Sequence, residues 1–239
     1  MALPEVSDSL PLGDKKLPDG SQDLTASQSP YHIEIFTGQE LLDSSVLREL
    51  QTVINAAYQS HDNNPLGAIG ERIQHDTQIV DEIGTNGFTV VMSCADEIVG
   101  TASVKNWKPS IQENDWKPAG HYAGRSADEA SAMDAVPSIP EAVSCEGDVE
   151  VFMVAVKPGL QYRKKGVAEG LLRACEQQLK KQFGPKTDPV RVILRVVREI
   201  NSQYWLKKGY RIIGERYYPP LTWDVEKAFI LLAMRKDIR

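Results

Sequence analysis

The sequence has few cysteines and histidines, and they lie at spacings that form no metal-binding motif. Its three cysteines, Cys94, Cys145 and Cys175, include no Cys-x-x-Cys pair, and its four histidines are scattered. Because structural zinc sites need closely spaced Cys and His ligands, we expect no metal site. A low and odd cysteine count fits a reducing compartment. We therefore expect a cytoplasmic protein, with the nucleus as the alternative.

Excess positive charge and long apolar runs are also missing. The formal net charge is −6 at pH 7, and nucleic-acid-binding domains usually carry a basic face, so we expect no nucleic-acid partner. No stretch approaches the roughly 18 consecutive apolar residues that suggest a membrane span, so we expect no membrane partner. With 41% apolar and 25% charged residues, the composition is that of a globular protein.

The residues that are present divide the chain into a leader and one domain. Residues 1–30 are rich in Ser, Pro, Asp and Gly and show no apolar periodicity, so we expect a flexible leader. From residue 31 onwards, strand and helix patterns alternate in a mixed α/β order. The expected strands are 31–36, 88–93, 98–104, 149–156, 189–197, 210–216 and 228–234, and the expected helices are 42–57, 69–83, 167–179 and 199–208.

Residues 107–146 interrupt this order. They carry four prolines, many Ser and Ala and several acidic residues, and a connection of this length in a compact domain is usually functional or disordered. The sequence leaves open a mobile flap beside a binding site, an arm for dimer formation, or plain disorder. Within this segment, a short helix at 126–133 is expected.

The most specific pattern follows the strand 149–156. The Lys-Pro-Gly of residues 157–159 ends that strand, since proline has no N–H to donate. The basic run 163–168, Arg-Lys-Lys-Gly-Val-Ala, then opens an amphipathic helix. The first amides of a helix have no internal partner and the helix dipole favours negative charge, so this loop predicts an anion site. Neither a Walker pattern nor a dinucleotide-binding glycine pattern is present.

The run Arg163-x-x-Gly166-x-Ala168 resembles the Arg/Gln-x-x-Gly-x-Gly/Ala signature of the GNAT superfamily of N-acetyltransferases. The element order around it is similar to that of the family as well. The resemblance implies a mixed α+β fold with a central, mostly antiparallel seven-stranded sheet flanked by about four helices. The N-acetyltransferase domain would span 31–237, with 107–146 as an insertion between the third and fourth strands. A homodimer is plausible by resemblance, since this fold often pairs through its C-terminal strands.

The resemblance also implies an activity and a cosubstrate. The activity would be direct transfer of an acetyl group from acetyl-CoA to a primary amine, on a small molecule or a protein, without a metal. The acidic insertion favours a cationic acceptor. A different interpretation is a CoA-binding regulatory domain with little or no catalytic activity.

The same resemblance assigns the cofactor-binding residues. The loop amides and side chains would hold the pyrophosphate, and the backbone of the fourth strand, where it splays from the fifth, would pair with the pantetheine arm. These residues are Arg163, Lys164, Lys165, Gly166, Val167 and Ala168 in the loop, and Met153, Val154, Ala155 and Val156 in the strand.

Glu150 is the candidate general base. It is a glutamate in an otherwise apolar strand, at the place where the histone-acetylating branch of the family carries its catalytic glutamate. An acyl transfer to an ammonium requires removal of a proton, and a positioned carboxylate can accept it. The alternative is a structural ion pair with Arg191 or Arg195.

Tyr204 is the candidate acid for the leaving thiolate, although the sequence departs from the family here. The family has a tyrosine four residues before the glycine that corresponds to Gly209, and this chain has Trp205 at that place, with Tyr204 beside it. An indole N–H donates a hydrogen bond but cannot act as an acid. Tyr217 or Tyr218 could supply a hydroxyl instead.

Asn201 matches an asparagine that often contacts the cofactor arm in the family. An N-cap role at the start of the same helix is the alternative interpretation of this residue.

Overall fold

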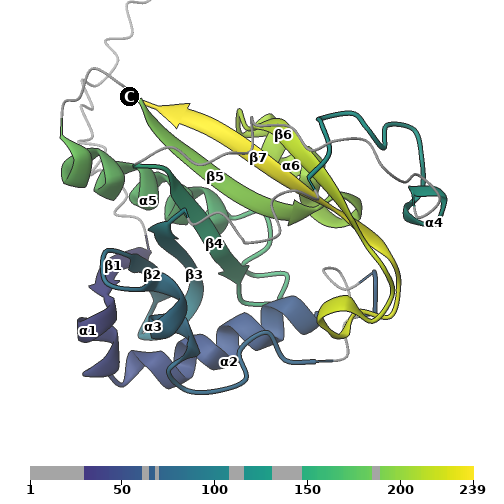
Figure 1. The fold of residues 1–239 in the computed structure, drawn as a ribbon. Helices are drawn as coiled ribbons and strands as arrows, with labels where there is room; N and C mark the ends of the chain where they lie inside the picture. The colour runs from purple at the N-terminus through teal and green to yellow at the C-terminus, as the bar shows by residue number, and fades with distance from the viewer. Residues whose placement is uncertain (1–29, 61–64, 68–69, 108–115, 131–146, 185–188) are drawn as a thin grey trace, which may run out of the picture.

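The computed structural model describes residues 30–60, 65–67, 70–107, 116–130, 147–184 and 189–239 (Figure 1). The expected leader therefore lies outside the described residues except for Pro30, as do parts of the expected insertion. In the parts of the chain that the structure describes, no helix is long and apolar enough to cross a membrane.

A seven-stranded sheet forms the centre of the molecule. Its order is β1-β2-β3-β4-β5-β7-β6, and all neighbours are antiparallel except β4 and β5. This confirms the expected mostly antiparallel sheet. The strands are β1 (Tyr31–Thr37), β2 (Phe88–Cys94), β3 (Glu97–Asn106), β4 (Val149–Val156), β5 (Val190–Val197), β6 (Arg211–Tyr218) and β7 (Phe229–Ile238).

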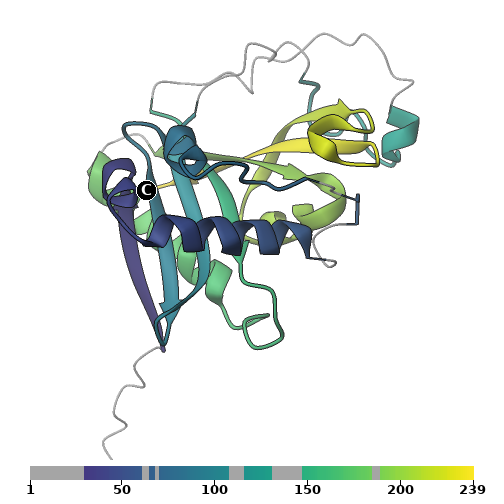
Figure 2. The same cartoon turned by 90° about the horizontal axis from the view of Figure 1, so that it is seen from below.

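Helices cover both faces of the sheet (Figures 1 and 2). Apolar residues of β2, β3, β4, β5 and β7 form one core with α5 (Val167–Phe183) and α6 (Arg198–Lys207). A second core lies under α1 (Gly38–Leu42), α2 (Val46–Gln59) and α3 (Gln78–Ile83), and it includes the side chains of Met153 and Ala155. The remaining helices are α4 (Ala127–Ala130) and a 3-10 turn at Thr222–Asp224.

The N-terminal helices differ from the sequence prediction. The helix expected at 42–57 begins at Val46 and follows a separate short helix, which a capping box between Thr37 and Glu40 starts. Of the helix expected at 69–83, residue 69 lies outside the described residues, and within residues 70–83 the helix is limited to Gln78–Ile83. The reason lies in Asn55, whose buried carboxamide bonds both the N–H and the C=O of Ile73 (2.8 and 2.9 Å). These bonds occupy backbone groups that a helix would use internally. The described residues thus contain six α-helices, not about four.

The strands β4 and β5 separate soon after they meet. Their register contains only the pairs Val149↔Val192 and Glu150↔Ile193, although β4 continues to Val156 and β5 to Val197. The backbone edge of β4 beyond Glu150 that faces β5 therefore has no strand partner among the described residues. This is the splay that the resemblance implies.

A β-bulge lies in the splayed part of β4. The register between β3 and β4 shifts between Thr101 and Ser103, and Met153 has a φ of 48°. A bulge of this kind bends its strand and redirects the backbone that follows. Met153 and Ala155 are buried under the α1–α3 layer, whereas Val154 and Val156 pack on the α5 side.

Residues 116–130, most of the described part of the expected insertion, pack against the edge strand β6. Lys117 forms a β-bridge with Glu215, and the Glu215 carboxylate accepts hydrogen bonds from the N–H groups of Gly120 and Tyr122 (both 2.9 Å). Arg198, the first residue of α6, donates to the carbonyls of Tyr122 and Arg125. This segment is therefore docked, and a homodimer that paired through β6 would have to accommodate it. The expected helix 126–133 is seen as Ala127–Ala130, and its remainder lies outside the described residues.

Candidate functional site

The loop between β4 and α5 is anchored at its start to the hairpin of β2 and β3. Both Lys157 and the Tyr162 hydroxyl donate hydrogen bonds to the carboxylate of Glu97, the first residue of β3. These bonds, that from Lys157 above all, hold the pKa of Glu97 below its usual range. Two turns close on Gly159, whose carbonyl accepts from the N–H groups of Tyr162 and Arg163. The loop therefore reaches α5 in one defined course.

Gly166 is the N-cap of α5 and has a left-handed backbone, with a φ of 81°. Glycine adopts this conformation without steric cost. A Cβ built at Gly166 meets no heavy atom within 4 Å, so the space beside it is open. No side chain caps the helix, and the first bond in its backbone ladder is Gly170 N–H to the Gly166 carbonyl.

The amides at this end of α5 form a donor set for an anion. The N–H groups of Gly166, Val167, Ala168 and Glu169 donate to no residue that the structure describes. Orphan amides at a helix N-terminus, together with the helix dipole, bind phosphate groups. The side chains of Arg163, Lys164 and Lys165 are exposed around them and add positive potential. The loop residues expected from the sequence are thus together at one site.

The unpaired edge of β4 adjoins this donor set. Met153, Val154, Ala155 and Val156 form the end of β4, and the loop starts directly after them. Unpaired backbone N–H and C=O groups in an extended strand can pair with an amide-containing chain as a further strand would. Here an open strand edge is followed in the chain by a helix N-terminus. Together they can hold a ligand that has an extended amide-bearing arm and a phosphate group.

Glu150 is the last residue of β4 that pairs with β5, and its side chain is only 3% exposed. Arg195 donates to both of its oxygens, Nε to Oε1 at 2.8 Å and Nη2 to Oε2 at 3.2 Å. The Lys105 ammonium, from the residue opposite Glu150 in β3, is 3.5 Å from Oε2. Of the two alternatives from the sequence, the structure shows the ion pair with Arg195, and the base role stays a hypothesis.

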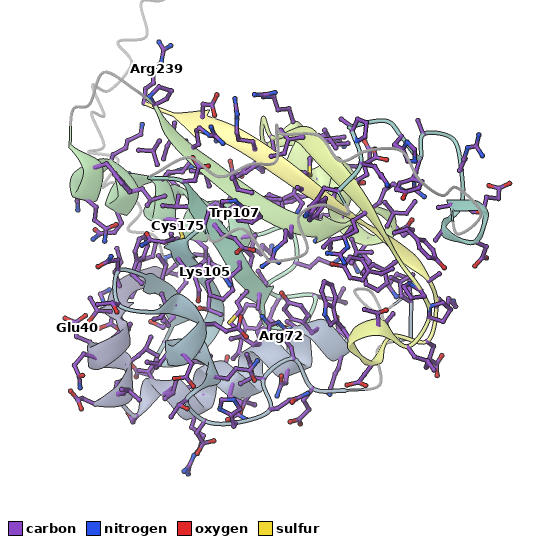
Figure 3. The ribbon with its side chains drawn as sticks, in the orientation of Figure 1. Glu40, Arg72, Lys105, Trp107, Cys175 and Arg239 are labelled. Carbon is purple, nitrogen blue, oxygen red and sulfur yellow. The ribbon has the colours of Figure 1, made fainter. Side chains whose placement is uncertain are left out.

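Lys105 also adjoins a second charged pair, Glu82 and Arg72 (Figure 3 labels Lys105 and Arg72). Lys105 is 4.0 Å from Glu82, which also forms two hydrogen bonds of 2.9 Å with Arg72. Burial raises the pKa of Glu82, but the hydrogen bonds from Arg72 and Gln78 outweigh this and lower it overall. The second arginine of β5, Arg191, pairs with Asp148 instead of Glu150 (2.9 Å).

Tyr204 lies beside the first turn of α5. Lys208 is placed over its ring at 5.6 Å and pairs with Glu169 of that turn at 3.2 Å. The Tyr204 hydroxyl is buried and has no hydrogen-bond partner among the described residues. Burial, with a smaller contribution from the Glu169 charge, raises the pKa of Tyr204. The phenol therefore keeps its proton at neutral pH and can donate it.

Trp205, which stands at the place of the family's tyrosine, is a core residue. It is 4% exposed, and its ring packs edge-on against Tyr204 and Tyr210. Asn201 is exposed on α6. The N-cap of this helix is Val197, so the N-cap interpretation of Asn201 is wrong. Its proposed contact with a cofactor arm stays a prediction.

Sequence reasoning missed Lys105, Trp107 and Glu97. The register of the hairpin and β4, which places Lys105 opposite Glu150, could have indicated Lys105, whereas Trp107 and Glu97 gave no signal in the sequence. Among the described residues, no group of three or more His, Cys, Asp or Glu side chains is placed to hold a metal.

The ion pair at Glu150 gives a stability prediction. Arg195→Gln leaves a buried carboxylate with Lys105 alone, and breaking a buried pair costs about 3–5 kcal/mol. Arg195 is itself 35% exposed, so we expect the lower end, about 3 kcal/mol, from urea unfolding. The double change Glu150→Gln with Arg195→Gln should recover most of the loss, because it removes both charges. Additive losses would show that the two side chains do not depend on each other.

No protein-family model and no curated protein matches the sequence. Solved structures do match the fold. Escherichia coli ElaA is 14% identical, with a TM-score of 0.50 over 86% of this chain and 99% of its own. The ribosomal-protein-S18-alanine N-acetyltransferase from Escherichia coli is 12% identical, with a TM-score of 0.51 over 87% of this chain and 94% of its own.

A third structure, an acetyltransferase of the GNAT family from Streptococcus pneumoniae, is 11% identical, with a TM-score of 0.51 over 87% of this chain and 99% of its own. Identities this low establish the fold alone. The chain therefore has the fold of the GNAT N-acetyltransferases.

Proposed function

We propose that this protein is an acyl-CoA-dependent N-acyltransferase that moves an acetyl group from acetyl-CoA to a primary amine. The observation that carries the proposal is the continuity of two binding surfaces. The open edge of β4 leads directly into the loop that presents the amides of Gly166 to Glu169. The GNAT fold of the chain supports the same function.

The residues present fit coenzyme A. The amides from Gly166 to Glu169 would hold the pyrophosphate, because they are free donors beside open space at Gly166. The side chains of Arg163, Lys164 and Lys165 would add positive potential. The backbone from Met153 to Val156 would hold the amide-bearing pantetheine arm. Acetyl-CoA supplies an activated thioester, so the protein's main task is to place the amine beside it.

Of the two candidate catalytic side chains, Tyr204 and Glu150, only Tyr204 would transfer a proton. Tyr204 holds a proton on a buried phenol oxygen that lacks a partner, and we propose that it donates this proton to the leaving thiolate. Glu150 was the candidate base, but both of its oxygens already bind cations. We propose that its first task is to hold Arg195 and that the amine can lose its proton to solvent.

The second candidate function is a CoA-binding regulatory domain with little or no activity. Trp205 at the place of the family's tyrosine favours it, because an indole cannot act as an acid. Cofactor binding without turnover of any amine would identify this function.

Calorimetric titration with acetyl-CoA tests the cofactor site. We expect binding in the micromolar range, corresponding to about −7 to −8 kcal/mol. Gly166→Glu should abolish it, because the variant places a negative side chain in the open space beside the free amides. Gly166→Gln is the matched variant, since it carries the same backbone strain and a similar size without the charge, and it should retain measurable binding.

Gly184→Glu provides the second control. Gly184 lies at the other end of α5, also has a positive φ (65°), and a Cβ there also meets nothing within 4 Å. This variant adds the same charge at another positive-φ glycine of the same helix, and the affinity of the folded variant for acetyl-CoA should equal that of the wild type. Failure of the wild type to bind either acetyl-CoA or coenzyme A would overturn the proposed function.

Tyr204→Phe tests the proton donor. We expect kcat to fall by about 10²–10⁴-fold, the usual contribution of a general acid, with little change in the affinity for acetyl-CoA. Tyr210→Phe is the control, because Tyr210 is a buried tyrosine of the same aromatic cluster to which we assign no catalytic role. Equal rates for Tyr204→Phe and the wild type would remove Tyr204 from the mechanism.

A further inference from the structure

Arg195 lies on β5 just beyond the point where β5 separates from β4. It lies two residues beyond Ile193, the last residue of β5 that pairs with β4. Its guanidinium reaches back to Glu150, the last residue of β4 that pairs with β5. Val192, Leu194 and Val196 belong to the core under α5 and α6. By strand alternation, Arg195 points to the opposite face, where the α1–α3 layer lies. The guanidinium therefore spans the point at which the strands part.

One edge of this guanidinium is used and another is not. Nε and Nη2 form the fork that binds Glu150. Nη1 makes no hydrogen bond with any residue that the structure describes. A guanidinium can bind two carboxylates through different edges, because its donors lie in one plane with fixed directions. The Nη1–Nη2 edge of Arg195 is thus available, and its side chain is 35% exposed.

The surroundings hold Arg195 in place. Its guanidinium lies 5.6 Å from the ring of Trp107, which is 8% exposed. The Trp107 Nε1–H is buried and has no hydrogen-bond partner among the described residues. Glu150 binds from the other edge. An arginine held by a carboxylate and an aromatic ring loses little conformational freedom when it binds a ligand.

Around Arg195, the charged side chains that reach the surface are mainly cationic. Arg195, Arg72 and Lys105 have side chains that are 35%, 29% and 20% exposed, whereas the side chains of Glu82 and Glu150 are 25% and 3% exposed. An incoming ligand therefore meets cations before it meets Glu150. This arrangement repels a polycation and attracts an anion.

We propose that Arg195 binds a carboxylate of the acceptor, so that the acceptor is a small amine that also carries a carboxylate, such as an amino acid. This rests on the proposed function, in which acetyl-CoA bound along β4 would bring its thioester to the point where β4 and β5 part, beside Arg195. Arg195 is then a specificity residue, and Glu150 is the residue that positions it. The proposal opposes the cationic acceptor that the acidic insertion favours.

Matched pairs of amines test the proposal. Release of coenzyme A would be followed at fixed pH with L-lysine against cadaverine and with glycine against glycinamide, and rates would be compared per neutral amine. Within each pair, only one member carries a carboxylate. We expect kcat/KM to be on the order of 10- to 100-fold higher for the carboxylate-bearing member, the range for a charged hydrogen bond. O-phosphoethanolamine distinguishes a phosphate from a carboxylate.

Variants link the preference to Arg195. The double variant Glu150→Gln with Arg195→Gln should lose the preference through a rise in the acceptor KM, with kcat within about tenfold, whereas a base would lower kcat. Arg191→Gln is the control, because Arg191 lies on the same strand as Arg195 and the variant removes its ion pair with Asp148. It should keep the preference.

The outcomes separate this proposal from the proposed function. Transfer with equal rates within each pair, or a preference for the phosphate, would overturn the carboxylate site and leave the acetyltransferase intact. If acetyl-CoA binds and no amine reacts, the proposed function fails. The site is then judged by thermal stabilisation with N-acetylglycine against N-acetylglycinamide, where a shift from the acid alone supports the site and equal shifts contradict it.

Discussion

The separation of β4 from β5 is the constraint on which the candidate site depends. Parallel neighbours in a sheet normally share a continuous ladder, and here the ladder stops after two pairs. The sheet leaves an open strand edge in its middle, with α5 and α6 on one side and α2 and α3 on the other. Buried backbone groups without partners are costly, so such an edge persists where a ligand or water can pair with it. The bulge at Met153 and the turns on Gly159 then direct the chain into the amides at Gly166.

Electrostatics divides the two sides of the splay. On the α5 side, free amides and basic side chains favour an anionic cofactor. On the other side, a buried glutamate is neutralised by Arg195 and Lys105, which keeps Glu150 inside the sheet at low cost and leaves the cationic edge of Arg195 outward. The ion pair between Glu150 and Arg195 also links β4 to β5 at the point where the two strands part. One contact thus contributes both to the stability of the sheet and to the chemistry of its surface.

Most of the fold and the course of the loop before α5 could be predicted from the sequence, because they rest on local signals. Strand runs such as 149–156, the Lys-Pro-Gly stop and the amphipathic helix after Gly166 all depend on residues close in the chain. The features that the sequence prediction missed or left open depend on distant contacts. Asn55 holds the backbone at Ile73 and shortens α3. Glu215 fixes residues 116–130 on β6. The choice of Arg195 over Arg191 for Glu150 follows from the register of β4 with β5, which no local pattern encodes.

Hydrogen–deuterium exchange with and without acetyl-CoA tests the central claim most directly. We expect slower amide exchange in two peptides, those covering the end of β4 (Met153 to Val156) and the start of α5 (Gly166 to Glu169), because these backbone groups would bind the cofactor. Peptides from β7, which lies between β5 and β6 and pairs with both, should be unchanged. Protection that appeared elsewhere in the chain, with these two peptides unaffected, would contradict the claim that the splay and the loop form the cofactor site.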